Sequence, residues 1–289
     1  MFIFITTLRH PKNSISYKRV ETLLERTVKS VCNQTNRNFR FIVVGNQLPQ
    51  FPSVPSEMDF VRVDFKPPSA LKGSKLDIND CRTDKATKYF IGLLHARQYN
   101  PEYVMFLDAD DVVSNKITEY ANSHPDRNGW LIDKGYIYGD GGVLIRWTKE
   151  FHMKCGTSRI VNWKLLNVPS NFPAQPNQNY ILRNVDSNFL RKVLGIHRET
   201  ESYFRNIGFP LEPLPFYGAI WILDTGENRS GKSLMRIGYP VSSKIRKEFN
   251  LELPKVNFKF LITYFLGLPF SMAKLTLKIW EKLRIALSI

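Results

Sequence analysis

The strongest constraint on the fold is an alternation of short apolar runs with amphipathic stretches through the first part of the chain. Runs typical of strands occupy 2–7, 40–45, 60–65 and 103–107, and stretches with helical spacing occupy 17–35 and 84–99. Strands that alternate with helices pair in parallel through right-handed crossovers. The pattern therefore predicts an α/β domain whose mostly parallel central sheet is flanked by helices.

The alternation becomes less regular beyond residue 115. Runs typical of strands occupy 130–132, 142–145 and 217–223, and stretches with helical spacing occupy 117–123, 186–194 and 199–206. Glycines at 139–142 predict a turn, and the prolines and asparagines of 167–180 predict a loop. The second half is thus expected to complete the same domain with shorter elements.

An acidic cluster follows the last early strand, in the order Leu107-Asp108-Ala109-Asp110-Asp111. Three carboxylates this close repel one another, and at the end of a buried strand a bound cation would offset that cost. Oxygen ligands suit Mg²⁺ or Mn²⁺, which also bridge the oxygens of a diphosphate. Ligands of open α/β sheets bind beyond the carboxyl ends of the strands. We therefore predict that Asp108, Asp110 and Asp111 hold a divalent metal.

Two other interpretations of this cluster compete with a metal site. Aspartates are common at helix caps and turns, so the motif alone is weak evidence for a metal site. Haloacid-dehalogenase-type phosphatases also carry Asp-x-Asp after an apolar strand, but on the first strand of their fold. Here at least three predicted strands precede the motif and Asp111 adds a third carboxylate, which favours metal binding over phosphoryl transfer.

The net charge of +15 predicts an anionic partner, such as a phosphorylated substrate or an acidic membrane surface. No nucleic-acid-binding motif is present, so nucleic acid is not expected. Cys32, Cys81 and Cys155 are far apart in the sequence and predict neither a disulfide framework nor zinc. The apolar start of the chain is too short for a signal peptide. A cytoplasmic location is expected, with a peripheral place on the inner face of the membrane as the alternative.

The chain divides at about residue 250 into a catalytic domain, 1–250, and a basic amphipathic tail, 251–289. Within the tail, Lys274, Lys278 and Lys282 share one helical face, and apolar side chains that include Trp280 occupy the other. That profile is typical of a helix lying on an anionic membrane surface. Docking of the tail on the protein's own core is the alternative.

Residues 226–233 match the phosphate-loop pattern G-x-x-x-x-G-K-[ST] and follow a predicted strand. Alone, this match indicates a nucleoside triphosphatase. Pro240, however, follows before a full helix can form, and no later apolar strand ends in an aspartate that would help to hold magnesium. We interpret the segment as a basic loop near a bound diphosphate, with Arg229 and Lys232 closing over it.

With these motifs in place, the chain resembles GT-A-type glycosyltransferases of the family-2-like, bacterial type over residues 1 to about 230. The resemblance includes a first strand, a helix ending in Ser30-Val31-Cys32-Asn33-Gln34-Thr35, the helix start at Asp84-Lys85-Ala86, and the Asp-x-Asp strand. It implies transfer of a sugar from a nucleotide-diphosphate-sugar donor to a hydroxyl acceptor, with Mg²⁺ or Mn²⁺. A hexosyl or deoxyhexosyl donor and a polysaccharide or lipid-linked acceptor are the expected substrates.

The resemblance also implies positions for donor binding. These are Thr6, Thr7, Arg9, Asn46, Arg82, Asp84, Lys85, Asp108, Ala109, Asp110 and Arg229. Lys85 and Arg82 would pair with phosphate as charge-assisted donors. This chain departs from the family where many members place an acidic residue after the second strand, because it has Asn46 there. The identity of the nucleotide therefore stays open.

An inverting transferase needs a base that takes the proton of the acceptor hydroxyl. Glu199 is the first candidate, His197 the second, and Asp140, in its glycine-rich turn, the third. The turn Cys155-Gly156-Thr157-Ser158 is expected to face the donor sugar or the acceptor. A phosphohydrolase that uses the 226–233 segment, and a catalytically silent membrane-associated protein, remain the alternative functions.

Overall fold

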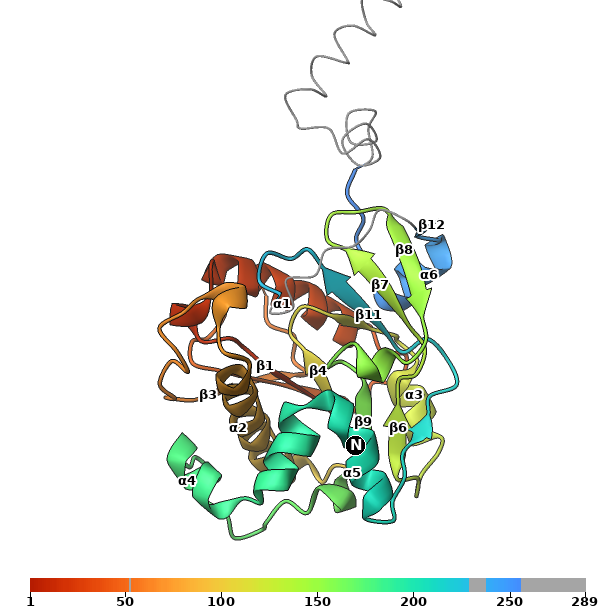
Figure 1. Ribbon diagram of the computed structural model, residues 1–289. Helices are drawn as coiled ribbons and strands as arrows, with labels where there is room; N and C mark the ends of the chain where they lie inside the picture. The colour runs from red at the N-terminus through yellow and green to blue at the C-terminus, as the bar shows by residue number, and fades with distance from the viewer. Residues whose placement is uncertain (52, 229–237, 256–289) are drawn as a thin grey trace, which may run out of the picture.

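The computed structural model describes residues 1–51, 53–228 and 238–255 (Figure 1). Arg229, residues 230–233 of the phosphate-loop-like segment and residues 256–289 of the tail lie outside the described residues. The strands are β1 (Phe2–Thr7), β2 (Phe39–Gly45), β3 (Met58–Arg62), β4 (Tyr103–Asp108), β5 (Val112–Val113), β6 (Gly129–Leu131), β7 (Gly135–Gly139), β8 (Leu144–Thr148), β9 (Arg159–Asn162), β10 (Glu212–Pro213), β11 (Ala219–Leu223) and β12 (Tyr239–Pro240). The α-helices are α1 (Tyr17–Val31), α2 (Ile78–Ala96), α3 (Ile117–Asn122), α4 (Gln178–Asn184), α5 (Thr200–Asn206) and α6 (Ser243–Phe249).

The larger sheet has the strand order β10-β6-β9-β4-β1-β2-β3. β1 lies between β2 and β4 and runs parallel to both, while β3 runs parallel to β2. β9 is antiparallel to its neighbours β4 and β6, so the sheet is mixed. The four early strands are parallel, as the alternation with helices predicted. The predicted α/β architecture is confirmed, and it is consistent with a GT-A, Rossmann-like fold.

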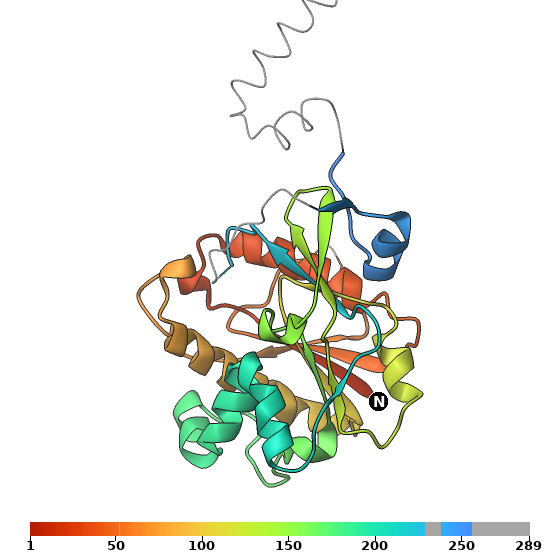
Figure 2. The ribbon, with the colours of Figure 1, turned by 45° about the vertical axis from the view of Figure 1, so that its right-hand side comes forward.

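Helices cover both faces of the larger sheet (Figures 1 and 2). On one face, Leu24 and Val28 of α1 pack in a core cluster with Phe4 of β1. On the other face, Leu93 of α2 packs in a cluster that also contains Ile5 of β1. α1 thus buries one apolar stripe against the sheet, whereas α2 is buried on nearly all sides from Ala86 to Leu94.

α2 begins at Ile78, earlier than the start predicted at residue 84. The Asp77 side chain accepts hydrogen bonds from the backbone N–H groups of Asn79 and Asp80, so Asp77 caps the helix ahead of the predicted start. As a result, Asp84 and Lys85 lie within the helix rather than in its first turn. The stretch 186–194, predicted as an α-helix, instead forms a π-helix, η6 (Phe189–Gly195).

A smaller sheet has the order β12-β8-β7-β11-β5 and lies beside the larger one (Figure 1). β7 is parallel to β11 and antiparallel to β8, and β12 pairs with β8 at the edge. Phe249 of α6 and the following Leu251 are buried in one cluster with Tyr138 and Ile222 of this sheet. None of the described helices combines the length and apolar character that a membrane span requires.

Gly92 allows α2 to approach β1 closely. A β-carbon at this position would lie 2.5 Å from Cγ2 of Ile5 and 3.3 Å from Cγ2 of Val44. We expect Gly92→Ala to lower the free energy of unfolding by about 1–2 kcal/mol, because overpacking costs about 1–3 kcal/mol and the helix propensity of alanine returns up to about 1 kcal/mol. Urea unfolding measures the difference. The control is Thr83→Ala at an exposed position of α2; equal losses in both variants would contradict the close-packing argument.

Candidate active site

A pocket of about 550 Å³ opens at the carboxyl ends of β1 and β4. Its walls come from segments that are far apart in the sequence, and they include Thr7, Leu8, Arg9, His10, Asn13, Arg82, Asp84, Lys85, Asp108, Ala109, Asp110, Lys154, Cys155, Gly156, His197, Arg198, Trp221, Glu227 and Asn228. This is the sheet edge at which ligands bind in open α/β folds. Acidic and basic side chains therefore meet in one cavity at the predicted place.

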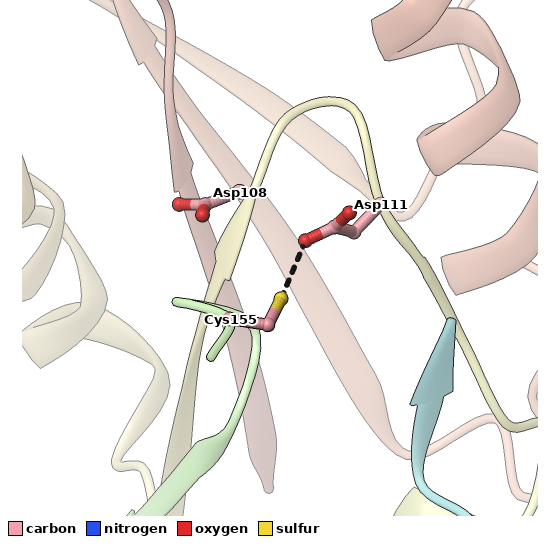
Figure 3. A group of neighbouring side chains, drawn as sticks. All are labelled: Asp108, Asp111 and Cys155. Atoms are coloured by element: carbon pink, nitrogen blue, oxygen red, sulfur yellow. Dashed lines mark hydrogen bonds between the residues drawn. The ribbon is translucent and has the colours of Figure 1, made fainter. Parts of the chain in front are cut away.

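The acidic cluster divides between the pocket and the protein interior. Asp108 and Asp110 line the pocket, whereas Asp111 is buried. Oδ1 of Asp111 accepts the backbone N–H of Ile222 at 3.0 Å. Its Oδ2 accepts the Thr157 hydroxyl at 2.5 Å. The same oxygen accepts the Cys155 thiol at 3.0 Å (Figure 3). Burial and the neighbouring charges of Asp110 and Asp108 raise the pKa of Asp111 well above its ordinary value. Asp111 thus links the turn after β4 to β11 and to the 155–158 turn.

Two combinations of these side chains could hold a metal ion. In one, the ligand atoms of Asp108, Asp111 and Cys155 lie within 4.8 Å of one another. Burial and the Asp111 charge raise the pKa of the Cys155 thiol, so the thiol keeps the proton that it donates to Asp111. A metal there would have to displace these hydrogen bonds. Asp108 and Asp110 instead present carboxylates to the open pocket, which better suits a hard cation shared with a diphosphate.

Lys85 of α2 forms an ion pair with Asp108 inside the pocket. Burial acts against the charge of Lys85, but the Asp108 carboxylate outweighs it and raises the Lys85 pKa. Burial likewise acts against the charge of Asp108, and Lys85 outweighs it and lowers the Asp108 pKa. Gly156 makes room for the pair, because a β-carbon there would lie 2.6 Å from Oδ2 of Asp108 and 3.0 Å from Nζ of Lys85.

Asp110 carries the strongest electrostatic cost among the carboxylates that line the pocket. Burial, followed by repulsion from Asp108, raises its pKa to about 6. Nδ2 of Asn228 donates to Oδ2 of Asp110 at 3.1 Å and to the Ile222 carbonyl at 3.0 Å. Oδ1 of Asn228 accepts both the backbone N–H and the hydroxyl of Thr225. These bonds hold the Asn228 amide in one orientation against Asp110.

The sequence arguments did not single out Asn228, Lys154 or Arg159. Asn228 lies in a segment interpreted only as a basic loop, and Lys154 precedes the small-residue turn that was expected to face the substrate. Arg159 is fully buried, and its guanidinium donates to the carbonyls of Gly156 and Leu194. It lies over the rings of Tyr89 and Phe106, with its central carbon 5.6 Å and 5.1 Å from their centres. No local sequence pattern distinguishes these residues from ordinary surface polar groups.

The three candidate bases lie in different surroundings. His197 lines the pocket, and burial, followed by the charges of Arg159 and Lys85, lowers its pKa to about 3. Glu199 accepts a hydrogen bond from Arg191 at 2.6 Å and is not among the residues that line the pocket. Asp140 pairs with Arg19 and Arg26, and it too lies outside the pocket lining. The structure therefore brings only His197 of the three to the cavity.

Some of the predicted donor-binding residues line the pocket and others do not. Thr7, Arg9, Arg82, Asp84, Lys85, Asp108, Ala109 and Asp110 line the pocket. Thr6 is buried and donates to the Leu107 carbonyl at 2.9 Å, which ties the ends of β1 and β4 together. Asn46 donates to the Phe65 carbonyl at 2.8 Å, outside the pocket lining. Arg229 lies outside the described residues.

Comparison with known proteins adds a general likeness of fold. No protein-family model matches the chain, and no curated protein matches it. The solved structures that resemble it include TarS of S. aureus, at 11% identity and a TM-score of 0.38 over 76% of this chain and 60% of that one. TarS in complex with UDP-GlcNAc gives 12% identity and a TM-score of 0.40, over 94% of this chain and 69% of that one. The glycosyltransferase GlyE of Streptococcus pneumoniae gives 12% identity and a TM-score of 0.31, over 73% and 44%. At these identities and TM-scores, the activities of those proteins cannot be assigned to this chain.

Asn228 is expected to position the Asp110 carboxylate. Asn228→Ala should weaken Mn²⁺ binding by about 10–100-fold, the usual effect of losing a partner that orients a metal ligand. Isothermal titration calorimetry measures the affinity directly, without relying on turnover. Asn33→Ala is the control, since that amide donates to the Lys247 carbonyl and does not line the pocket. Unchanged Mn²⁺ affinity in Asn228→Ala would contradict the positioning role.

The raised pKa of Asp110 predicts a pH-dependent cost of folding in the absence of metal. A carboxyl whose pKa is higher in the folded protein destabilises it when ionised, and protonation relieves that cost as the pH falls through about 6. In chelator, the Tm of Asp110→Asn minus that of the wild type should therefore be largest near about pH 8 and shrink toward about pH 4. Calorimetric scans test this. A Tm difference that does not change with pH would show that Asp110 is not strained by its charge.

Proposed function

We propose that this chain is a GT-A-type glycosyltransferase that moves a sugar from a nucleotide-diphosphate sugar to a hydroxyl acceptor. The observation that carries the proposal is the composition of the pocket at the carboxyl edge of the larger sheet. Asp108 and Asp110 face a cavity that Arg9, Arg82 and Lys154 also line. A cavity with two carboxylates and several cations suits a metal-bound diphosphate, because the metal takes the carboxylates and the cations take the phosphates.

In this proposal Asp108 and Asp110 hold Mg²⁺ or Mn²⁺, and Asp111 keeps their turn in place through its contacts with Ile222 and Thr157. The metal would stabilise the charge that develops on the departing nucleotide diphosphate. Lys85 would interact with both Asp108 and the donor phosphates, because its ion pair with Asp108 lies at the pocket wall. Thr7, Arg9, Arg82 and Asp84 would contact the rest of the donor.

The chemical step is a displacement at the anomeric carbon of the sugar. The acceptor oxygen forms the new bond to this carbon, and the bond to the phosphate oxygen breaks and leaves its electron pair on the diphosphate. The acceptor proton passes to a base. We propose His197 for contact with the acceptor, because it alone of the three candidates lines the pocket. With its pKa at about 3, His197 is neutral and could accept a hydrogen bond from the acceptor hydroxyl, but it is too weak a base to keep the proton at neutral pH. Glu199 and Asp140 would act only after leaving their arginine partners.

We further propose a hexosyl or deoxyhexosyl donor and a polysaccharide or lipid-linked acceptor, with the chain held on an anionic membrane surface through its 251–289 tail. The basic charge of the chain and the spacing of Lys274, Lys278 and Lys282 support the membrane contact. Glu227 and Asn228 of the phosphate-loop-like segment line the same pocket, and Asn228 donates to Asp110 there, so the described part of the segment supports the acidic cluster.

Thermal shift with a panel of nucleotide sugars tests the proposal, and the panel begins with UDP-GlcNAc, the ligand of the TarS complex. One nucleotide class plus Mn²⁺ should stabilise the wild type by about 3 kcal/mol at a hundredfold excess over Kd. Asp110→Ala should lose this stabilisation, and Glu252→Gln, at an exposed acid paired with Lys29, should keep it. Stabilisation by ATP and by no nucleotide sugar would instead favour the 226–233 segment and overturn the proposal.

A further inference from the structure

The smaller sheet has an outer face that carries a row of aromatic side chains. Strand register places Tyr136 opposite Trp147 and Tyr138 opposite Ile145 on β7 and β8. Tyr239 of β12 lies opposite Ile145 from the other side. Because paired residues of neighbouring strands point to the same side of a sheet, these five side chains share one face. The pocket is on the other side, since Trp221 lines it and alternates with Ile220 and Ile222 on β11.

α6 and the residues after it cover only part of this outer face. Phe249 packs against Tyr136 with ring centres 5.8 Å apart, and Val241 and Leu251 are buried in the same cluster. At the rim of the covered area, Trp147 is 50% exposed and Tyr239 is 65% exposed. Two large aromatic side chains are thus half or more in water on the face that α6 otherwise closes.

The helix that covers part of this face, α6, carries exposed basic side chains. Ile245 and Phe249 of α6 turn toward the sheet, so Lys244, Arg246 and Lys247 project away from it and are exposed. The nearby acids have partners elsewhere: Glu248 accepts from Ser114 and Lys116, and Glu252 pairs with Lys29. α6, β8 and β12 lie together at one end of the molecule (Figures 1 and 2). We call Trp147, Tyr239, Lys244, Arg246 and Lys247 the outer rim.

We propose that the outer rim docks on an anionic lipid surface. Indole and phenol rings favour the boundary between water and acyl chains, and lysine and arginine reach anionic headgroups with their charged ends. The exposed aromatic side chains would insert at the boundary of the acyl chains, and the basic side chains of α6 would bind the anionic headgroups. The proposal extends the membrane contact proposed for the tail to a surface of the folded domain, and it does not depend on the sugar-transfer chemistry.

Vesicle co-sedimentation of the full chain tests the docking. The vesicles are either pure phosphatidylcholine or an equimolar mixture with phosphatidylglycerol. Lys244→Gln/Lys247→Gln should lower partitioning onto the mixed vesicles about 25-fold, since each basic residue near the surface contributes about fivefold. Trp147→Ser/Tyr239→Ser should lower partitioning onto both kinds of vesicle, because ring insertion does not need lipid charge. The matched controls are Lys72→Gln/Lys75→Gln and Phe209→Ser, whose positions are exposed but lie outside the outer rim.

Equal partitioning of the rim variants and the wild type, with loss only in Lys274→Gln/Lys278→Gln, would assign the contact to the tail alone and overturn the proposal. A fall in Tm of Trp147→Ser/Tyr239→Ser without vesicles, with normal partitioning, would mean that the rim is covered by the chain itself and would also overturn it. Donor-induced stabilisation is measured on every variant. If the rim variants lose vesicle binding but keep this stabilisation, the docking is separate from donor binding. If the wild type shows no such stabilisation, the proposed sugar transfer fails while the docking result still stands.

Discussion

Asp108, Asp110 and Asp111 bring three carboxylates together at the end of β4. Their mutual repulsion is offset by different contacts at each residue. Lys85 pairs with Asp108, and the Asn228 amide donates to Asp110. Asp111 turns inward to accept from Ile222, Thr157 and Cys155. A buried carboxylate without such partners would shift its pKa until it became neutral. Asp110 and Asp111 both keep raised pKa values, but of the two only Asp110 lines the pocket, where a bound cation could relieve the repulsion.

These contacts also explain why distant segments converge on one turn. Ile222 belongs to the smaller sheet, Thr157 precedes β9 of the larger one, and Lys85 lies on α2. The acidic turn therefore joins both sheets and a helix through side chains rather than through the backbone ladder. A substrate bound in the pocket would meet α2, the 155–158 turn and, through Trp221, the smaller sheet.

The smaller sheet serves two surfaces at once. Successive side chains of a strand point to opposite faces, so Trp221 of β11 reaches the pocket while Ile220 and Ile222 face α6. The face under α6 ends in the outer rim, which is aromatic and basic. In the proposed function, this sheet therefore separates the donor pocket on one face from the lipid-docking rim on the other.

The sequence by itself determined the α/β architecture and the position of the acidic turn, because both follow from local periodicities. Alternating and helical spacing act within one element, and the carboxyl end of β4 could be located from its apolar run alone. Only the tertiary structure decided which side chain of that turn faces the pocket. Asn228 meets Asp110 across 118 residues of chain, and Ile222 meets Asp111 across 111. Likewise, only the tertiary structure decided that His197 lines the pocket while Glu199 and Asp140 pair with arginines. Contacts at such separations arise from the packing of whole elements, so short motifs carry no information about them.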